Sequence, residues 1–384
     1  MKNPIYLDYN STSQPDPQVI ESMLPFFKED FGNPSNNLHS YGWSAENAVK
    51  KAAEKVAALI NCEPLEIIWN AGATEGNNSV IFGLIRKLKL TNPTEKIHFI
   101  TSEVEHWSVL NSFAAAEKFE SISTTLLPVS TDGVVSLSEL KKHIRPETKL
   151  VSLIWVNNEI GALNPIDEIA SYCNEHQIYF HTDATQAVGK IKVDLQKTPV
   201  HFLTFSSHKL YGPKGIGALY IRSKKPNVEI EPFIVGGGQQ HNQRSGTLNV
   251  PAIVGTGTAA ELCLQNMDKE FEKARKMSQF LYSELQKNLP HIQLNGPVLN
   301  ERSPYNLSLR MPQMIDFVLP QLSELAFSKG SACQSGEASI SHVLKAIGLN
   351  STQAQSTIRL SIGRFTTEVE ITRAAQIILN AFKI

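Results

Sequence analysis

Short apolar runs alternate regularly with amphipathic stretches of helical period through the first two-thirds of this sequence. The runs have the length and the β-rich composition of buried strands, and they cover residues 66–69, 97–101, 123–127, 150–156, 179–182, 200–205 and 218–221. Strands that alternate with helices predict an α/β fold, in which helices cover both faces of a mostly parallel sheet. Ligands of such sheets bind at the carboxyl ends of the strands, so the residues that follow each run are candidates for a site.

Residues 44–60 are typical of the helical stretches between the runs. We expect Ser44 to be the N-cap of this helix, with Glu46 in its first turn. The apolar residues then recur at the spacing of one helix face: Ala45, Ala48, Val49, Ala52, Val56 and Leu59.

The chain of 384 residues is too long for one ordinary hydrophobic core. The alternation stops near the glycines at 236–238 and Pro251, and a long helical pattern follows at roughly 259–289. The rest has the pattern of a smaller α+β unit. We therefore expect a large domain of residues 15–258 and a small domain made of residues 1–14 and 259–384.

The composition narrows the class of protein. Hydrophobic residues make up 41% and charged residues 19%, as in a globular chain, and 36 Lys and Arg nearly balance 37 Asp and Glu. We therefore expect no direct contact with nucleic acid. The four cysteines form no C-x-x-C pair, no apolar run follows the N-terminal lysine, and no stretch reaches the ~18 apolar residues of a membrane span. These patterns favour a cytoplasmic protein that does not bind membranes.

Lys209 ends the tetrapeptide SSHK, which directly follows an apolar run. A surface lysine after a strand is the ordinary interpretation. Here, however, hydroxyls such as Ser206 and the imidazole of His208 precede it, and both can donate to a phosphate. A glycine-rich turn, residues 211–217, follows. A lysine that is fixed on such a turn and partly desolvated can form a Schiff base with an aldehyde cofactor.

Asp183 comes directly after the run 179–182, where a carboxylate could pair with a pyridinium nitrogen. Three residues later, Gln186 could donate to a ring hydroxyl. An N-cap aspartate that opens a helix is an equally good interpretation of Asp183, and the two roles are compatible.

Two further turns have candidate residues. The small residues at 72–78, with Ala73 and Thr74 among them, follow a strand and lead into a helix, whose free N–H groups can bind a phosphate. His106 follows another strand, where an imidazole could stack on an aromatic cofactor and transfer protons near neutral pH. Each pattern is also common in structural turns.

Cys333 stands among glycine, serine and glutamine, with no apolar neighbour to pack against, and this predicts a mobile exposed loop. An exposed thiol of this kind is typical of a nucleophile. The cysteines at 62, 173 and 263 have the surroundings of buried small hydrophobes. Arg359 lies in a pattern that alternates as a strand does, and its guanidinium could bind a substrate carboxylate with two hydrogen bonds.

In their order along the chain, these residues resemble the cysteine desulfurases, which are class V pyridoxal-phosphate enzymes of fold type I. The spacing between Cys333 and a predicted helix at 341–347 is similar to that of the longer-loop subgroup. Residues 36–37 and 238–244, Gln334 and Gly336 depart from the family pattern, and they bear on which acceptor receives the sulfur. The resemblance runs almost end to end, through YLDYN (6–10), GNPS (32–35), GATE (72–75), EH (105–106), VNNEIG (156–161), DATQ (183–186), SSHK (206–209), RSGT (244–247), RLS (359–361) and GRF (363–365).

The resemblance implies a fold and a set of roles. The fold is a mostly parallel seven-stranded sheet between helices, with a smaller α+β domain. Lys209 would bind pyridoxal phosphate covalently, Asp183 would pair with the ring nitrogen and His106 would stack on the ring. Gln186 and Asn158 would contact the ring or its hydroxyl, and Arg359 with Asn158 would hold the substrate. The phosphate would be bound by Ala73, Thr74, Ser206 and His208, and by Thr247 from the other subunit of a homodimer.

The implied reaction converts L-cysteine to L-alanine and leaves a persulfide on Cys333, which a protein acceptor then receives. That acceptor could belong to iron–sulfur cluster assembly, tRNA thiolation or DNA phosphorothioation. Three alternatives stay open: a selenocysteine lyase, an aminotransferase that does not need Cys333, and a non-catalytic dimeric scaffold of a sulfur-transfer complex.

Overall fold

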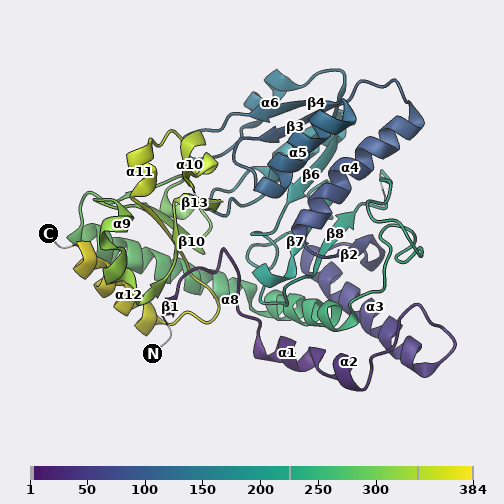
Figure 1. Ribbon diagram of the computed structural model, residues 1–384, viewed down its shortest axis with the longest axis horizontal. Coiled ribbons are helices and arrows are strands. Elements are labelled where there is room, and N and C mark those ends of the chain that lie inside the picture. The colour runs from purple at the N-terminus through teal and green to yellow at the C-terminus, as the bar shows by residue number, and fades with distance from the viewer. Residues whose placement is uncertain (1–3, 225, 335–336, 383–384) are drawn as a thin grey trace.

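The computed structural model describes residues 4–224, 226–334 and 337–382, and its largest element is a seven-stranded sheet (Figure 1). Strand β8 is antiparallel to both of its neighbours, β2 and β7, whereas the other adjacent pairs are parallel. The predicted mostly parallel α/β fold is therefore confirmed. The order across the sheet is β2 (Ile67–Asn70), β8 (Gly217–Ile221), β7 (Phe202–Ser206), β6 (Tyr179–Asp183), β5 (Thr148–Ile154), β3 (His98–Ser102) and β4 (Ser123–Leu127).

Helices cover both faces of this sheet because successive side chains of a strand point to opposite sides. Phe99 and Phe202 pack with α4 (Ala73–Thr91) and α5 (Trp107–Glu120) on one face. Their neighbours on the strands, such as Ile100 and Leu203, belong to the core on the other face. The helices of that second layer are α3 (Ser40–Ile60), α6 (Leu137–His143), α7 (Ile166–Glu175) and the first half of α8 (Val250–Asn288).

A second core lies around a four-stranded antiparallel sheet with the order β12 (Ser328–Lys329), β15 (Thr357–Ser361), β10 (Asn306–Arg310) and β9 (Gln293–Leu294). The second half of α8 and helix α12 (Glu368–Phe382) pack on it. Strand β1 (Ile5–Tyr6) pairs with β11 (Leu325–Ala326), so the N-terminal segment joins this part. Helix α8 runs through residues 258 and 259, and the proposed division into domains there stays a prediction.

Short helices complete the described chain. They are α1 (Pro17–Met23), α2 (Pro25–Lys28), α9 (Ile315–Val318), α10 (His342–Ala346) and α11 (Ser351–Gln355), with 3₁₀ turns at Pro64–Glu66, Ser207–Lys209, Leu299–Glu301 and Leu319–Leu322.

Two helices begin earlier than predicted, because other side chains cap them. Helix α3 begins at Ser40, and the ring of His39 accepts a hydrogen bond from the Gly42 N–H (3.2 Å). Ser44 therefore lies inside the helix and is not its N-cap. Helix α8 begins at Val250 rather than near 259, because the Asn249 side chain accepts from the Ala252 N–H (3.2 Å).

The segment around Cys333 was predicted to be a mobile exposed loop, and the structure describes only its backbone pairing. The backbone forms an antiparallel hairpin of β13 (Ser331–Gln334) and β14 (Glu337–Ile340), in which Cys333 pairs with Ala338. The Cys333 side chain and the whole of Gly336 lie outside the described residues. Cys173 and Cys263 are buried as expected, but Cys62 is partly exposed.

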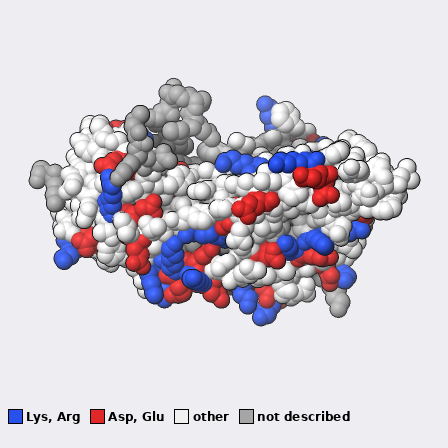
Figure 2. All heavy atoms as spheres, turned by 90° about the horizontal axis from the view of Figure 1, so that it is seen from below, with Lys and Arg blue, Asp and Glu red and all other residues white. Residues whose placement is uncertain are grey.

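Within the described ranges, no helix is both long enough and apolar enough to cross a membrane. On the face of the molecule seen in Figure 2, Lys and Arg side chains are interspersed with Asp and Glu, as their near-equal numbers lead one to expect.

Candidate active site

Functional side chains meet where parallel strands of the large sheet end. Strand β6 ends at Asp183 and β7 ends at Ser206, and the turn that carries Lys209 follows β7. His106 is the N-cap of α5 after β3. These residues line a cavity of about 380 Å³ together with Asn10, Ser11, Ala73, Thr74, Ser108, Ile154, Asn158, Thr185, Gln186, His208 and Arg359.

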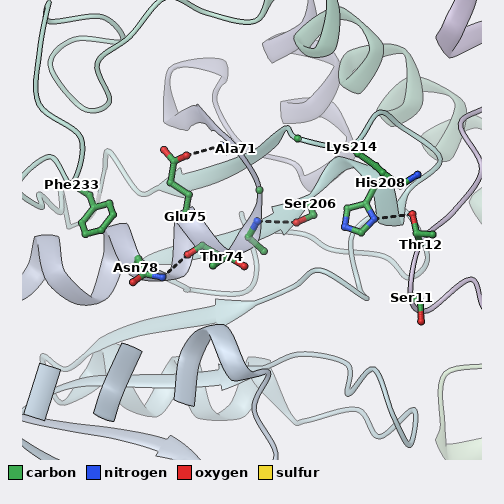
Figure 3. Close-up of a pocket in the computed structure, with 13 residues that line it drawn as sticks. Ser11, Thr12, Ala71, Thr74, Glu75, Asn78, Ser206, His208, Lys214 and Phe233 are labelled. Atoms are coloured by element: carbon green, nitrogen blue, oxygen red, sulfur yellow. Dashed lines mark hydrogen bonds between the residues drawn. The ribbon is translucent and has the colours of Figure 1, made fainter. Parts of the chain in front are cut away.

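A more open cavity of about 840 Å³ continues from this one at the N-terminus of α4 (Figure 3). The two cavities share Ser11, Ala73, Thr74, Ser206 and His208. The Ala73 N–H donates to Ser206 Oγ (2.8 Å), so the serine keeps its own hydrogen for another acceptor. Free N–H groups at a helix N-terminus, with hydroxyls beside them, fit a phosphate.

Glycine is required at the entrance to α4. Gly72, the N-cap, has a φ of +136°, which other residues rarely adopt. One turn later, a Cβ on Gly76 would lie 2.7 Å from Thr204 Cγ2, so glycine lets the first turn of α4 approach β7 closely. The backbone therefore places this helix end directly beside Ser206.

Lys209 directs its amine toward the N-terminal segment, where Nζ donates to Asn10 O (2.6 Å) and Ser11 O (2.5 Å). Burial lowers the pKa of Lys209 to about 8, and the nearby charge of Arg359 adds to this effect. A substantial fraction of the amine is therefore neutral near pH 8 and able to act as a nucleophile or base. Gln186 Nε2 donates to the same Asn10 O (2.8 Å).

Asp183 is buried and held by directed donors. The Thr185 N–H donates to Oδ1 and Asn77 Nδ2 donates to Oδ2, each at 3.0 Å. Thr204 donates to Asn77 Oδ1 (2.5 Å), and this fixes the Asn77 amide with its NH₂ group toward Asp183. A turn rather than a helix follows Asp183, so it is not the N-cap that the alternative interpretation proposed.

The hydrogen bonds around His106 determine which ring nitrogen has the proton. The Ser108 N–H donates to Nδ1 (3.1 Å), and Ser108 Oγ lies 2.8 Å from the same atom. Ser108 Oγ already accepts from Asn77 Nδ2 (2.8 Å), so its own hydrogen is directed to His106. Nδ1 is therefore an acceptor, and the neutral ring has its proton on Nε2. Burial lowers the pKa of His106, which favours this neutral form.

Arg359 reaches the cavity from β15 of the smaller sheet. Its Nη2 donates to Asp8 Oδ1 (2.8 Å), Ser11 Oγ (2.6 Å) and Ser328 Oγ (2.7 Å), and Nη1 donates to Asn158 O (3.3 Å). Its Nε is buried without a partner among the described residues. The guanidinium is thus held in place, while the hydrogen of Nε and one hydrogen of Nη1 have no partner among the described residues.

The structure does not bring every predicted residue into the cavity. Thr247 is exposed and lies outside the linings of both cavities, and for Cys333 only the backbone is described.

Sequence reasoning gave no role to Asn10, Asn77, Ser108, Lys190 or Lys214, which line the cavities or contact residues that do. Three of them lie in segments that the sequence did single out: Lys214 in the glycine-rich turn after Lys209, Asn77 in the small-residue turn at 72–78, and Asn10 in the YLDYN segment.

Comparison with known proteins gives consistent results. The family profile described as Aminotransferase class-V matches residues 5–374. A protein of Ehrlichia chaffeensis named cysteine desulfurase IscS is 44% identical over 381 residues, which are 99% of this chain and 91% of that protein. A solved NifS-like protein has a TM-score of 0.88 at 32% identity and 98% coverage of both chains. A structure titled SspA in complex with cysteine has a TM-score of 0.83 at 35% identity, over 94% of this chain and 99% of that one.

Proposed function

The chain belongs to the class V aminotransferase family and is a pyridoxal-phosphate-dependent cysteine desulfurase, and we propose that Lys209, Asp183 and Cys333 are the residues on which this activity depends. The observation that carries the proposal is that one cavity joins a desolvated lysine, a buried carboxylate and an imidazole to the N-terminus of a helix.

The donor set of the cavity fits pyridoxal phosphate. Lys209 would hold its aldehyde carbon, Asp183 its ring nitrogen and Gln186 its ring oxygen, while His106 would cover the ring. Ala73, Thr74, Ser206 and His208 would bind its phosphate. The buried hydroxyl of Thr185, which has no partner among the described residues, is a further polar group left for a ligand. When bound, the cofactor withdraws electrons from the substrate carbon that loses its proton.

Arg359 and Asn158 would orient the substrate. The free Nε of Arg359 can bind a carboxylate, and Asp8 keeps the guanidinium in one orientation through Nη2. The substrate amine and sulfur would then be directed toward Lys209 and toward the hairpin of Cys333.

Protons would be transferred by Lys209 and His106. The neutral amine of Lys209 takes the proton from the substrate α-carbon, which its pKa of about 8 permits near neutral pH. The neutral ring of His106 has its proton on Nε2. His106 would therefore donate this proton before it accepts another.

Cys333 would receive the sulfur. Its thiolate attacks the sulfur of cysteine, so that a sulfur–sulfur bond forms as the carbon–sulfur bond of the substrate breaks. One L-cysteine and one thiol thus give one L-alanine and one persulfide, with no external oxidant. A protein acceptor then takes this sulfur, and the use that fits the desulfurase family is iron–sulfur cluster assembly.

A second copy of the chain would complete the site. An exposed aromatic patch extends over Phe27, Phe31, Leu38, Tyr41 and Trp43, with Phe31 and Tyr41 in ring contact at 5.3 Å. A groove at the same side is lined by Pro34, Gln240 and Leu248, and Thr247 precedes the last of these. Pairing of this face in a homodimer would cover the patch and could bring Thr247 to the phosphate of the partner.

The test is to purify the protein with pyridoxal phosphate, add L-cysteine and a thiol reductant, and measure alanine and sulfide together. We expect equal amounts of both products, and a loss of at least about a hundredfold for Lys209→Ala, since proton transfer by a positioned group contributes that much. Lys192→Ala, at an exposed lysine, is the matched control. Wild type that makes no alanine, or Lys209→Ala with unchanged activity, would contradict the proposal.

A further inference from the structure

Lys190 is a buried lysine to which the mechanism above gives no role. It is the last residue of the turn after Asp183, and only 3% of it is exposed. Its Nζ donates to Gln186 Oε1 (2.5 Å) and lies 6.0 Å from the centre of the Tyr305 ring. It therefore lies directly behind a residue that lines the cofactor cavity.

A lysine in this position lowers the stability of the fold, because its charged amine loses its hydration on burial. Burial lowers its pKa to about 7, and the charges of Lys209 and Arg359 act in the same direction. A methionine has nearly the same length and would fill the space without a charge to desolvate. Packing alone therefore does not explain why an amine lies here.

The hydrogen bond from Lys190 fixes the orientation of the Gln186 amide. In the structure the amine is the donor and the amide oxygen the acceptor, and in its charged form the amine can only donate. The amide nitrogen must then face the opposite way, and Nε2 indeed donates to Asn10 O (2.8 Å). The second hydrogen of Nε2 has no acceptor within the described part of the chain.

We propose that Lys190 is a positioning residue that makes Gln186 present an N–H, rather than a carbonyl oxygen, to the ring oxygen of the bound cofactor. This inference rests on the proposed function, because it adds a residue role at the same cofactor site. If the amide turned over, its oxygen would face the ring oxygen and repel its negative form. The negative charge of a bound cofactor favours the charged, donor-only state of Lys190. Cofactor binding and the charged state of Lys190 would therefore stabilise each other.

The experiment measures pyridoxal phosphate affinity, the absorbance spectrum of the bound cofactor at fixed pH, and the thermal midpoint of the cofactor-free protein. The proteins are wild type, Lys190→Met, Gln186→Leu, the double variant and Lys192→Met, whose lysine is exposed. We expect Lys190→Met to bind about tenfold more weakly, as for the loss of one charge-assisted hydrogen bond. Its spectrum should shift toward the form with a protonated ring oxygen, while its thermal midpoint stays the same or rises.

The double variant shows whether Lys190 acts through Gln186. In the Gln186→Leu background, Lys190→Met should change the affinity by less than about twofold, because the group that it orients is gone. Lys190→Arg keeps a donor-only side chain and should bind the cofactor more tightly than Lys190→Met. Lys192→Met should match wild type.

Three results would overturn the inference while wild type still binds the cofactor and makes alanine: Lys190→Met with wild-type affinity and spectrum, effects of the two substitutions that simply add, or Lys190→Arg no better than Lys190→Met. Wild type that fails to bind the cofactor would overturn the proposed function as well.

Discussion

At the scale of single residues, the chemistry of the site comes from neighbours that are distant in sequence. Asp183 and Lys209 could be predicted because each follows a strand, where ligands of parallel sheets bind. Asn77 and Lys190 could not, because their roles arise from contacts with Asp183 and Gln186 that only the folded chain creates. A buried polar residue inside a helix or a turn has no local pattern that distinguishes it.

The pH dependence of stability tests whether Glu105 is buried in its protonated form. Burial raises its pKa to about 8, so the folded protein holds the proton more tightly than the unfolded chain. The carboxyl therefore costs nothing below its ordinary pKa of 4.5 and becomes increasingly destabilising as the pH rises toward 8. We expect Glu105→Gln to gain stability relative to wild type over this range, as measured by urea unfolding from about pH 5 to pH 8.

The matched control for that experiment is Glu103→Gln, since Glu103 lies two residues earlier and is exposed. Its difference from wild type should not vary with pH in this way. A Glu105→Gln difference that is constant over the whole range would show that Glu105 is not buried in its protonated form.

At the scale of elements, strand positions could be predicted more closely than helix starts. The predicted run 123–127 coincides with β4, and the pattern around Arg359 coincides with β15. The start of α3 was missed because several nearby residues are able to cap a helix, and tertiary packing selects His39. Similarly, the hairpin of β13 and β14 could not be foreseen, since its polar residues have no strand pattern.

Arg364 contacts three separate parts of the fold. Its substitution should therefore lower the stability of the whole protein. Nη1 lies 2.9 Å from Asp16 at the start of α1, Nε lies 2.6 Å from Glu270 of α8, and the guanidinium carbon lies 4.2 Å from the centre of the Tyr211 ring. Arg364→Met would leave the buried carboxylate of Asp16 and the half-buried carboxylate of Glu270 without their partner. We expect the free energy of unfolding, measured in urea, to fall by about 3 kcal/mol.

The exposed pair of Arg275 and Glu272 is the control for Arg364. Arg275→Met should change the unfolding free energy by less than about 1 kcal/mol, as surface ion pairs do. Equal effects of the two substitutions would show that the Arg364 network does not hold these elements together.

At the scale of the whole molecule, the alternating sequence predicts the sheet and its two helical layers, but not the order of the strands. That order brings the ends of β6 and β7 side by side and so places Asp183 near Lys209. The proposed homodimer is based on two further features, the open cavity at α4 and the exposed aromatic patch.

The homodimer has a direct test. We expect sedimentation to give the mass of two chains for wild type and a shift toward one chain for Phe31→Glu with Trp43→Glu, because the charges would oppose burial of the patch. The same variant should lose affinity for pyridoxal phosphate, since Thr247 of the partner would be absent. Leu90→Glu, at an exposed leucine on α4, is the control. A monomeric wild type with full cofactor affinity would contradict the dimer proposal.

The proposed activity depends on transfer of the sulfur of cysteine to Cys333. The most direct measurement is mass spectrometry of the proteolytic peptide that contains Cys333, after one addition of L-cysteine without reductant. We expect this peptide to gain the mass of one sulfur atom in wild type, but not in Lys209→Ala, while the peptides of Cys62, Cys173 and Cys263 stay unchanged. Alanine formation without added sulfur on Cys333, together with equal activity in Cys333→Ala, would show that Cys333 does not receive the sulfur.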